Sequence, residues 1–288
     1  MTRNRTLGNT SIEFFPIGLG AMPMSIEGHP NESQALEVFN TFVNGGGNFI
    51  DTANVYCVDD SDVGHNEQLV AKALRQFNHA NDIFVGSKGG LRRPKGNWTV
   101  DASPAWLRQS CEKSLHDLNC DSIFLYQLHS PDPDIPLTDS VGELSKLQEE
   151  GKIQYIGLSN VTVEHIELAL SITQIMSVQN RCNLFERTSF KNGVIEYCES
   201  NDITFIAHSP VGGHYQHAQR SDNVLLKKLA EKHNSSNYQI MIAWLLLKSK
   251  SIFPIPGASK TSSIMDSIQA VNVELNNEDM QLLEAIIN

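Results

Sequence analysis

Three consecutive segments decide the fold of this chain: Ile123-Phe-Leu-Tyr-Gln-Leu128, then Leu137-Thr-Asp-Ser-Val-Gly-Glu-Leu-Ser-Lys-Leu-Gln-Glu-Glu150, then Ile153-Gln-Tyr-Ile-Gly-Leu158. The first and third are short apolar runs, which are typical of buried strands, and the second has the spacing of an amphipathic helix. A strand, a helix and a second strand in this order predict a βαβ unit, in which the two strands run parallel.

The same alternation extends from this unit toward both ends of the chain. The predicted strands are Phe15–Leu19, Asn48–Ile50, Ile83–Val85, Ile123–Leu128, Ile153–Leu158, Ile175–Val178, Thr204–Ala207 and Ile252–Pro254. The predicted helices include Ser33–Val43, Ser103–Leu118, Leu137–Glu150 and Val224–His233. This pattern predicts an α/β fold in which the parallel strands close into a (β/α)8 TIM barrel. A doubly wound sheet is disfavoured, because Gly18-Leu-Gly20 does not continue into a Gly-x-Gly-x-x-Gly turn.

A short hairpin is expected before the first predicted strand. Gly8-Asn9 lies between β-prone flanks in Thr6–Ile12, which predicts a turn, and the hairpin would close the bottom of the barrel. The chain has 288 residues, which is close to the roughly 250 that one such barrel needs. We therefore expect residues 1–288 to form a single domain.

The composition disfavours several classes of function. The chain has 33 acidic and 22 basic residues, for a formal net charge of −11, and no segment concentrates the basic ones. Nucleic acid and membrane are therefore poor partners. Residues 1–10 lack the apolar core of a signal peptide, and the five cysteines are widely spaced without a C-x-x-C pair. We expect a cytoplasmic protein, whose oligomeric state the sequence does not indicate.

Ionisable side chains follow three consecutive predicted strands: Asp51 and His129 come directly after theirs, and Lys88 comes three residues after Val85. Because the carboxyl ends of the strands surround the active site of such a barrel, these side chains should lie close together. Tyr56 follows Asp51 by five residues, and the loop between them could bring its phenol to the same point. Taken singly, each residue is better explained by a capping, surface or packing role, and only their combination favours catalysis.

Together these four groups suit carbonyl reduction, in which hydride reaches carbon while the oxygen becomes an alkoxide that must be stabilised and protonated. The phenol of Tyr56 can donate that proton if Lys88 lowers its pKa from the usual value of about 10. Asp51 would keep Lys88 protonated, and His129 would donate a second hydrogen bond to the substrate oxygen.

Four motifs occur in the order found in aldo-keto reductases: Asn48-Phe-Ile-Asp-Thr-Ala-Asn-Val-Tyr56, Gly86-Ser-Lys88, Leu128-His-Ser-Pro131 and Gly157-Leu-Ser-Asn160. The chain resembles this family over its whole length. The resemblance implies an enzyme that reduces aldehydes or ketones to alcohols with NADPH. It also implies that Tyr56 is the proton donor of a catalytic tetrad that consists of Asp51, Tyr56, Lys88 and His129.

The resemblance further implies where the nicotinamide cofactor would bind. Ser159, Asn160 and Gln179 would hold the carboxamide, and His208 occupies the position of a tyrosine that usually stacks under the ring. An unperturbed imidazole titrates near pH 6.5, so His208 would make NADP⁺ binding depend on pH. The other expected cofactor residues are Gly20, Met22, Asp51, Ser209, Pro210, Gly213, Gly257, Ser259, Lys260, Ser263, Asp266 and Ser267.

The choice between NADPH and NADH depends on the segment after the last predicted strand. Ser259 and Lys260 suit the 2′-phosphate of NADPH. Where many family members have Arg, Glu and Asn, this chain has Ser263, Asp266 and Ser267, so one phosphate clamp is missing. The resemblance therefore implies a preference for NADPH and leaves the use of NADH open.

Trp98, with Tyr56 and His129, is expected to line the pocket for a small carbonyl substrate, which the sequence does not identify. His214 and His217 have a metal-like spacing, but no cysteine or paired carboxylate lies near them in sequence, so no metal is expected. Two alternatives to carbonyl reduction stay open. One is a Schiff-base lyase with Lys88 as nucleophile, and the other is a cofactor-binding, redox-sensing regulatory subunit with little turnover.

Overall fold

Residues 4–77, 80–213 and 223–286 are described by a computed structural model of the chain. Its main sheet has eight strands in the order β12-β11-β10-β9-β8-β5-β4-β3, all in parallel pairs. They are β3 (Leu19–Gly20), β4 (Phe49–Asp51), β5 (Phe84–Gly89), β8 (Ile123–Leu128), β9 (Ile153–Ser159), β10 (Ser177–Arg181), β11 (Thr204–His208) and β12 (Ile252–Ile255). A parallel bridge between Gly20 and Gly257 joins the two edges, so the predicted barrel is confirmed and nearly closed.

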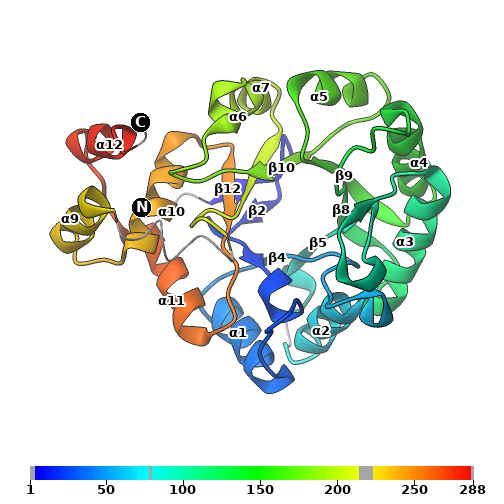
Figure 1. The fold of residues 1–288 in the computed structure, drawn as a ribbon, viewed down its shortest axis with the longest axis horizontal. Coiled ribbons are helices and arrows are strands. Elements are labelled where there is room, and N and C mark those ends of the chain that lie inside the picture. The colour runs from blue at the N-terminus through cyan, green and yellow to red at the C-terminus, as the bar shows by residue number, and fades with distance from the viewer. Residues whose placement is uncertain (1–3, 78–79, 214–222, 287–288) are drawn as a thin grey trace.

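Helices surround these strands on the outside (Figure 1). They are α1 (Glu32–Asn44), α2 (His65–Leu74), α3 (Pro104–Leu118), α4 (Leu137–Glu149), α5 (Val163–Leu170), α6 (Thr188–Lys191), α7 (Val194–Ser200), α9 (Val224–Lys232), α10 (Asn237–Lys248), α11 (Thr261–Gln269) and α12 (Asn277–Glu284). The predicted helix ends hold to within a residue or two. Ser103 caps α3 by accepting a hydrogen bond from the backbone N–H of Trp106.

The first barrel strand lies later in the sequence than predicted. The prediction was Phe15–Leu19, but β3 covers only Leu19–Gly20. Pro16 has no backbone N–H to donate to a neighbouring strand. Hydrogen bonding to the segment of β12 therefore begins at Gly18, whose N–H donates to the carbonyl of Pro254 at 3.0 Å.

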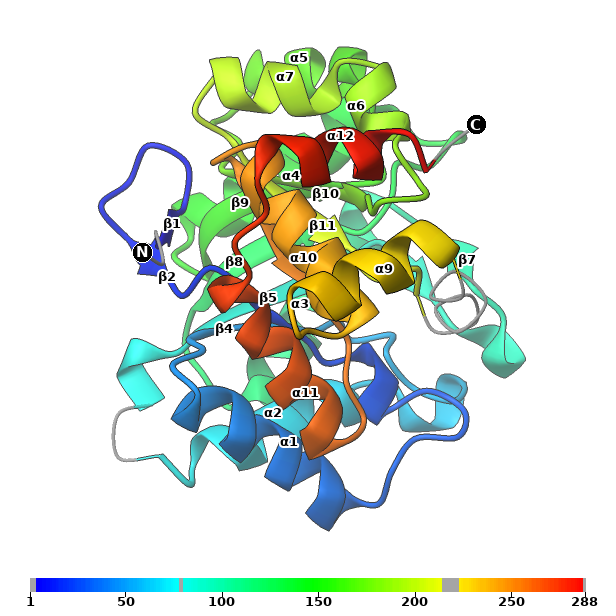
Figure 2. The ribbon, with the colours of Figure 1, turned by 90° about the vertical axis from the view of Figure 1, so that its left-hand side faces the viewer.

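The expected N-terminal hairpin is confirmed. Strand β1 (Arg5–Thr6) pairs antiparallel with β2 (Glu13–Phe14). The hydroxyl of Thr204, the first residue of β11, donates to the carbonyl of Thr6 at 2.9 Å. The hairpin thus packs on the amino ends of the barrel strands. Figure 2 shows it on the opposite side of the barrel from β7 (Thr99–Val100), which belongs to a loop at the carboxyl ends.

An apolar cluster fills the lower part of the barrel above this hairpin. It consists of Leu7, Phe14, Phe49, Phe124, Leu125, Met176, Ile206, Phe253 and Ile255, all buried. Six of these belong to barrel strands, five of them near the amino ends or midpoints, and two belong to the hairpin segment. Because apolar side chains occupy the bottom, the polar strand-end residues are confined to the opposite mouth.

Within the described ranges, no helix has the length and apolar character needed to cross a membrane. In the same ranges, no group of three or more His, Cys, Asp and Glu side chains is arranged to hold a metal ion. His214 and His217 lie outside the described residues.

Candidate active site

The four residues of the predicted tetrad meet at the mouth of the barrel. Asp51 ends β4, Lys88 lies in β5, His129 directly follows β8, and Tyr56 comes from the loop after β4. The ammonium of Lys88 donates to Asp51 Oδ2 at 2.6 Å, to the phenol oxygen of Tyr56 at 2.9 Å and to the carbonyl of Thr52 at 2.9 Å. A chain of contacts thus runs from a carboxylate through an ammonium to a phenol.

Burial and neighbouring charges together set the pKa values of Lys88 and Tyr56. Burial would by itself lower the pKa of Lys88, but the carboxylate of Asp51 and the phenol of Tyr56 raise that pKa above its usual value. Burial raises the pKa of Tyr56, and the opposing effect of Lys88 is smaller. Lys88 lowers the Tyr56 pKa, as expected, but burial outweighs this effect and the net pKa is raised. The phenol stays protonated at neutral pH, as a proton donor must be.

His129 is buried beside the phenol, with its ring centroid 5.8 Å from that of Tyr56. Burial, and then the charge of Lys88, hold its pKa well below the usual value for histidine. Its backbone is fixed from both sides, because its N–H donates to the carbonyl of Gly89 at 2.8 Å and its carbonyl accepts from Asn160 Nδ2 at 2.9 Å. A neutral imidazole held in this way can donate one hydrogen bond to a substrate oxygen.

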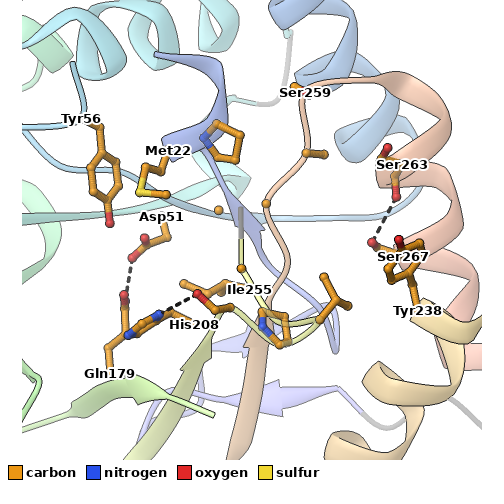
Figure 3. A pocket seen from close by; sticks show the side chains of 18 of the residues that line it. Met22, Asp51, Tyr56, Gln179, His208, Tyr238, Ile255, Ser259, Ser263 and Ser267 are labelled. Carbon is orange, nitrogen blue, oxygen red and sulfur yellow. Dashed lines mark hydrogen bonds between the residues drawn. The ribbon is translucent and has the colours of Figure 1, made fainter. Parts of the chain in front are cut away.

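A cavity of about 640 Å³ lies over these strand ends (Figure 3). Predicted site residues in its lining are Gly20, Met22, Asp51, Tyr56, Trp98, His129, Ser159, Asn160, Gln179, His208, Ser209, Pro210, Gly213, Gly257, Ser259, Ser263, Asp266 and Ser267. Two predicted residues do not line it. Lys88 is buried beneath Tyr56 and Asp51, and Lys260 is exposed at the N-cap of α11.

The lining also contains six residues that the sequence analysis missed: Pro23, Val211, Tyr238, Ile255, Ala258 and Ser262. Most of them are adjacent in sequence to residues that were predicted to line the site, so this adjacency could have been used to predict them as well. Tyr238 is different, because it comes from α10, ahead of the last strand, and no local motif marks it.

Two side-chain amides near the tetrad donate hydrogen bonds to Asp51. Gln179 Nε2 donates to Asp51 Oδ1 at 2.8 Å, and this contact is drawn in Figure 3. Gln127, which the sequence analysis did not single out, donates to the same oxygen at 3.4 Å. Gln179 therefore orients Asp51 from the cavity side, besides lining the cavity where a carboxamide was expected to bind.

His208 has a different protonation behaviour from the one expected. Its Nδ1 lies 3.1 Å from the hydroxyl of Ser209. Burial, followed by the charges of Lys88 and Arg181, lowers the pKa of His208 to about 3. The expected titration near pH 6.5 is therefore corrected: the ring that faces the cavity is a neutral imidazole throughout the physiological range.

The far end of the cavity lies at the start of α11. Asp266 accepts hydrogen bonds from Ser236 Oγ at 2.6 Å and from Gln239 Nε2 at 2.8 Å, so its carboxylate is held by α10 and its cap. Ser263 and Ser267 line the cavity beside it. Among the described lining residues there is no Lys or Arg. A phosphate at this end would be held by hydroxyls and by N–H groups of the first turn of the helix.

The site meets the requirements of a dinucleotide-dependent oxidoreductase on a (β/α)8 barrel. A protonated phenol, paired with a buried ammonium, lies at one end of the cavity, and a helix N-terminus lies at the other. The cavity has the size of a ligand pocket, and its polar groups suit an amide at the phenol end and a phosphate at the helix end.

The comparisons with known proteins agree with this class. The model of the aldo/keto reductase family matches residues 16–288. An uncharacterized oxidoreductase of Schizosaccharomyces pombe is 33% identical over 91% of this chain and 83% of its own length. A probable aldo-keto reductase of Glycine max is 29% identical over 97% of this chain and 88% of its own. A thermostable aldo-keto reductase, crystallised with the inhibitor epalrestat, superposes with a TM-score of 0.83, 29% identity and 99% coverage of both chains.

The chain therefore belongs to the aldo/keto reductase family, as the sequence motifs predicted. Members of this family are NAD(P)H-dependent oxidoreductases that act on carbonyl groups.

Proposed function

We propose that this chain reduces an aldehyde or ketone to the alcohol with NADPH and that Tyr56 is the proton donor. The observation that carries the proposal is the buried contact chain from Asp51 through Lys88 to Tyr56. Such a chain of contacts suits proton donation by the phenol. A carboxylate keeps the ammonium charged, and the ammonium stabilises the phenolate that remains after the proton has left.

Each residue of the tetrad has a defined part in this proposal. Tyr56 donates its proton to the carbonyl oxygen, and His129 donates a hydrogen bond to the same oxygen. Lys88 and Asp51 do not touch the substrate, because they lie below Tyr56 and act through it. The bound dinucleotide supplies the hydride. The cost of proton transfer falls because the phenolate forms next to a positive charge that is already in place.

The proposed cofactor site extends from the tetrad to α11. Ser159, Asn160 and Gln179 would hold the carboxamide, and His208 would lie against the nicotinamide ring. At the other end, Ser259 with the remaining predicted residues of 257–267 would hold the adenosine phosphates. The preference for NADPH rests on the N-terminus of α11 and on Lys260, whose exposed side chain would have to turn toward the 2′-phosphate.

Lys88 is poorly suited to the alternative role of a Schiff-base nucleophile. A nucleophilic lysine needs a lowered pKa and access to the substrate. The ammonium of Lys88 has a raised pKa, donates to three oxygens and is fully buried. Borohydride trapping in the presence of substrate is expected to leave this residue unmodified.

Turnover is tested by following NADPH absorbance with a panel of aldehydes, α-dicarbonyls, sugars and pyridoxal. We expect oxidation of NADPH with at least one member of the panel, at a rate that depends on its concentration. Tight binding of NADPH without any turnover would instead identify the regulatory subunit. The single domain, the cytoplasmic location and the lack of nucleic-acid or membrane partners stay predictions from the sequence.

A further inference from the structure

We propose that Arg93 is a positioning residue, which fixes the loop of Tyr56 and the Trp98 wall of the substrate pocket in one arrangement. The inference rests on the proposed function, because it concerns substrate use at the same site. Arg93 is not a member of the tetrad and does not line the cavity. Its contacts nevertheless join the two loops between which a carbonyl substrate would lie.

The first set of contacts is made to the loop of Tyr56. Arg93 Nη2 donates to the carbonyl of Cys57 at 3.1 Å and to that of Val58 at 3.0 Å. These are the two residues that directly follow Tyr56 in the chain. Since both bonds come from one buried nitrogen of a charged group, they restrain the backbone on the carboxyl side of the phenol.

The second contact is made to Trp98. Strands β6 (Leu91–Arg92) and β7 (Thr99–Val100) form an antiparallel hairpin in which Arg92 pairs with Thr99, so Arg93 and Trp98 are the next positions toward its tip. Arg93 Cζ lies 4.0 Å from the centroid of the Trp98 ring. Arg93 is 7% exposed and Trp98 is 48% exposed, so a buried cation supports a ring that lines the open cavity.

Trp98 in turn faces the catalytic groups. Its ring centroid lies 6.4 Å from that of Tyr56 and 6.4 Å from that of His129, in edge-to-face arrangements. A change in the position of the indole would therefore alter the space above both groups that contact the substrate oxygen. Arg93 controls that space through the indole and, independently, through the backbone after Tyr56.

The chemistry of arginine explains why this residue type is suited to the position. A guanidinium can stack its face on a ring while it donates hydrogen bonds in its plane, which an ammonium cannot do. Arg93 Nε and Nη1 are buried and have no hydrogen-bond partner in the described part of the chain. Within the described residues, Arg93 is therefore held by the two carbonyls and the indole rather than by an ion pair.

The experiment compares Arg93→Met and Arg93→Lys with the unaltered chain. Both variants lose the simultaneous stacking and donation, and Arg93→Lys keeps the charge. We expect kcat/KM for an aromatic aldehyde such as benzaldehyde to fall about 10- to 100-fold in Arg93→Met, because small misplacements of reacting groups are costly. The loss in Arg93→Lys should be smaller. The dissociation constant of NADPH should stay unchanged in both, because Arg93 lies outside the lining of the cofactor site.

A second readout follows Trp98 without any substrate. Acrylamide quenching of its fluorescence is isolated by subtracting the signal of a Trp98→Phe chain, which retains the other two tryptophans, Trp106 and Trp244. Loss of the supporting cation should raise the quenching of Trp98. Because no turnover is needed, this measurement separates a failure of the present inference from a failure of the proposed function.

Arg92→Met is the matched control. Arg92 lies on the same hairpin and also stacks on a tryptophan, Trp106, at 3.6 Å, but it ion-pairs with Asp101 and makes no hydrogen bond to the Tyr56 loop. The Arg92→Met variant should leave kcat/KM and the acrylamide quenching of Trp98 unchanged. The inference is overturned if both Arg93 variants keep normal kcat/KM and normal quenching. It is equally overturned if the folded fraction, measured by circular dichroism, accounts for the whole loss in Arg93→Met while Arg93→Lys behaves as the unaltered chain.

Discussion

Lys88 has no exposed surface, yet its surroundings keep it charged. Taking an ammonium out of water is unfavourable unless the charge is paired and its donors are satisfied. The three oxygens of Asp51, Thr52 and Tyr56 supply that pairing. Burial of Tyr56 has the complementary effect of keeping the phenol protonated, as the proposed proton donor must be. The buried site thus holds a charged ammonium, that of Lys88, next to the protonated phenol of Tyr56.

Tyr56→Phe tests this arrangement at its reacting atom. The change removes one oxygen that acts on the substrate and leaves the cofactor lining otherwise intact. We expect turnover to fall roughly 10²- to 10⁴-fold, the usual range for the loss of a general acid. The affinity for NADPH, measured by fluorescence titration, should change little. Tyr155→Phe on β9 is the matched control, because Tyr155 packs against the apolar cluster away from the mouth. Near-normal turnover in Tyr56→Phe would remove this residue from its role.

His208 gives a prediction about pH. Since its pKa is about 3 in the folded chain, the ring stays neutral between pH 5 and 8. The ratio of the dissociation constants of NADP⁺ and NADPH, measured by fluorescence titration over that range, should therefore be flat, in contrast to the expectation from an unperturbed histidine. Both cofactors carry the 2′-phosphate, so its titration cancels in the ratio. A ratio that rises as the pH falls through 6.5 would show that His208 gains a proton.

The same pKa shift has a consequence for stability. The unfolded chain binds a proton at this histidine below about pH 6.5, whereas the folded chain does not until about pH 3. The contribution of His208 to the free energy of unfolding is therefore fully present above about pH 6.5. It declines as the pH falls from about 6.5 to about 3.

At the scale of single elements, α11 decides how the adenosine end of a cofactor would be held. Ser262, Ser263 and Ser267 of this helix line the cavity, and the carboxylate of Asp266 already accepts hydrogen bonds from Ser236 and Gln239. The cation of this segment, Lys260, lies at the N-cap with its side chain exposed. A helix N-terminus attracts any phosphate, but a cation beside it can distinguish a 2′-phosphate from a hydroxyl.

Lys260→Ala should weaken the binding of NADPH and leave that of NADH nearly unchanged. We expect a loss of about 1.5 kcal/mol, the lower end of the range for a hydrogen bond to a charged group, because the side chain is exposed. That loss corresponds to roughly a tenfold rise in the dissociation constant of NADPH. Lys250→Ala is the control, since Lys250 is an exposed lysine at the other end of β12. An equal loss of affinity for both cofactors would show that Lys260 has only a structural role.

At the scale of the whole molecule, the barrel separates stability from chemistry along its axis. Aromatic rings fill the bottom, where Phe14 of the hairpin lies 5.0 Å from Phe49 and 5.3 Å from Phe253 between ring centroids. The polar tetrad occupies the mouth. Because the side chains that fill the bottom are largely different from those that line the mouth, a defect at the bottom should lower the stability of the fold before it affects the geometry of the site.

Phe14→Ala tests this separation. The side chain is buried, and its removal leaves a cavity between the strands, so we expect a loss of about 3–5 kcal/mol in the free energy of unfolding by urea. The KM for substrate, measured on the folded protein, should not change. Val224→Ala, at an exposed position of α9, should cost less than about 0.5 kcal/mol. A large rise in KM for Phe14→Ala at full folding would contradict the separation.

Several site features could not be predicted from the sequence, because they depend on distances between remote segments. Tyr238 reaches the cavity from a helix that precedes the last strand. Arg93, in the loop after β5, contacts the loop of Tyr56, which follows β4. Both contacts arise from packing and leave no spacing signal along the chain. The start of the first barrel strand also depended on a partner, since Gly18 pairs with the segment of β12 more than 200 residues away.

The sequence by itself predicted the barrel, its hairpin and the four residues of the proposed tetrad, because strand and helix periodicity is local and Asp51, Lys88 and His129 lie at or just beyond the carboxyl ends of their strands. Only the tertiary structure decided the charge states. Burial raises the pKa of Tyr56 against the opposing effect of Lys88, and burial together with the charge of Lys88 lowers the pKa of His208 to about 3. Likewise, only the path of the chain after β12 left Lys260 exposed outside the cavity lining. Burial and through-space charge set these properties, and neither is a function of neighbouring residues in the chain.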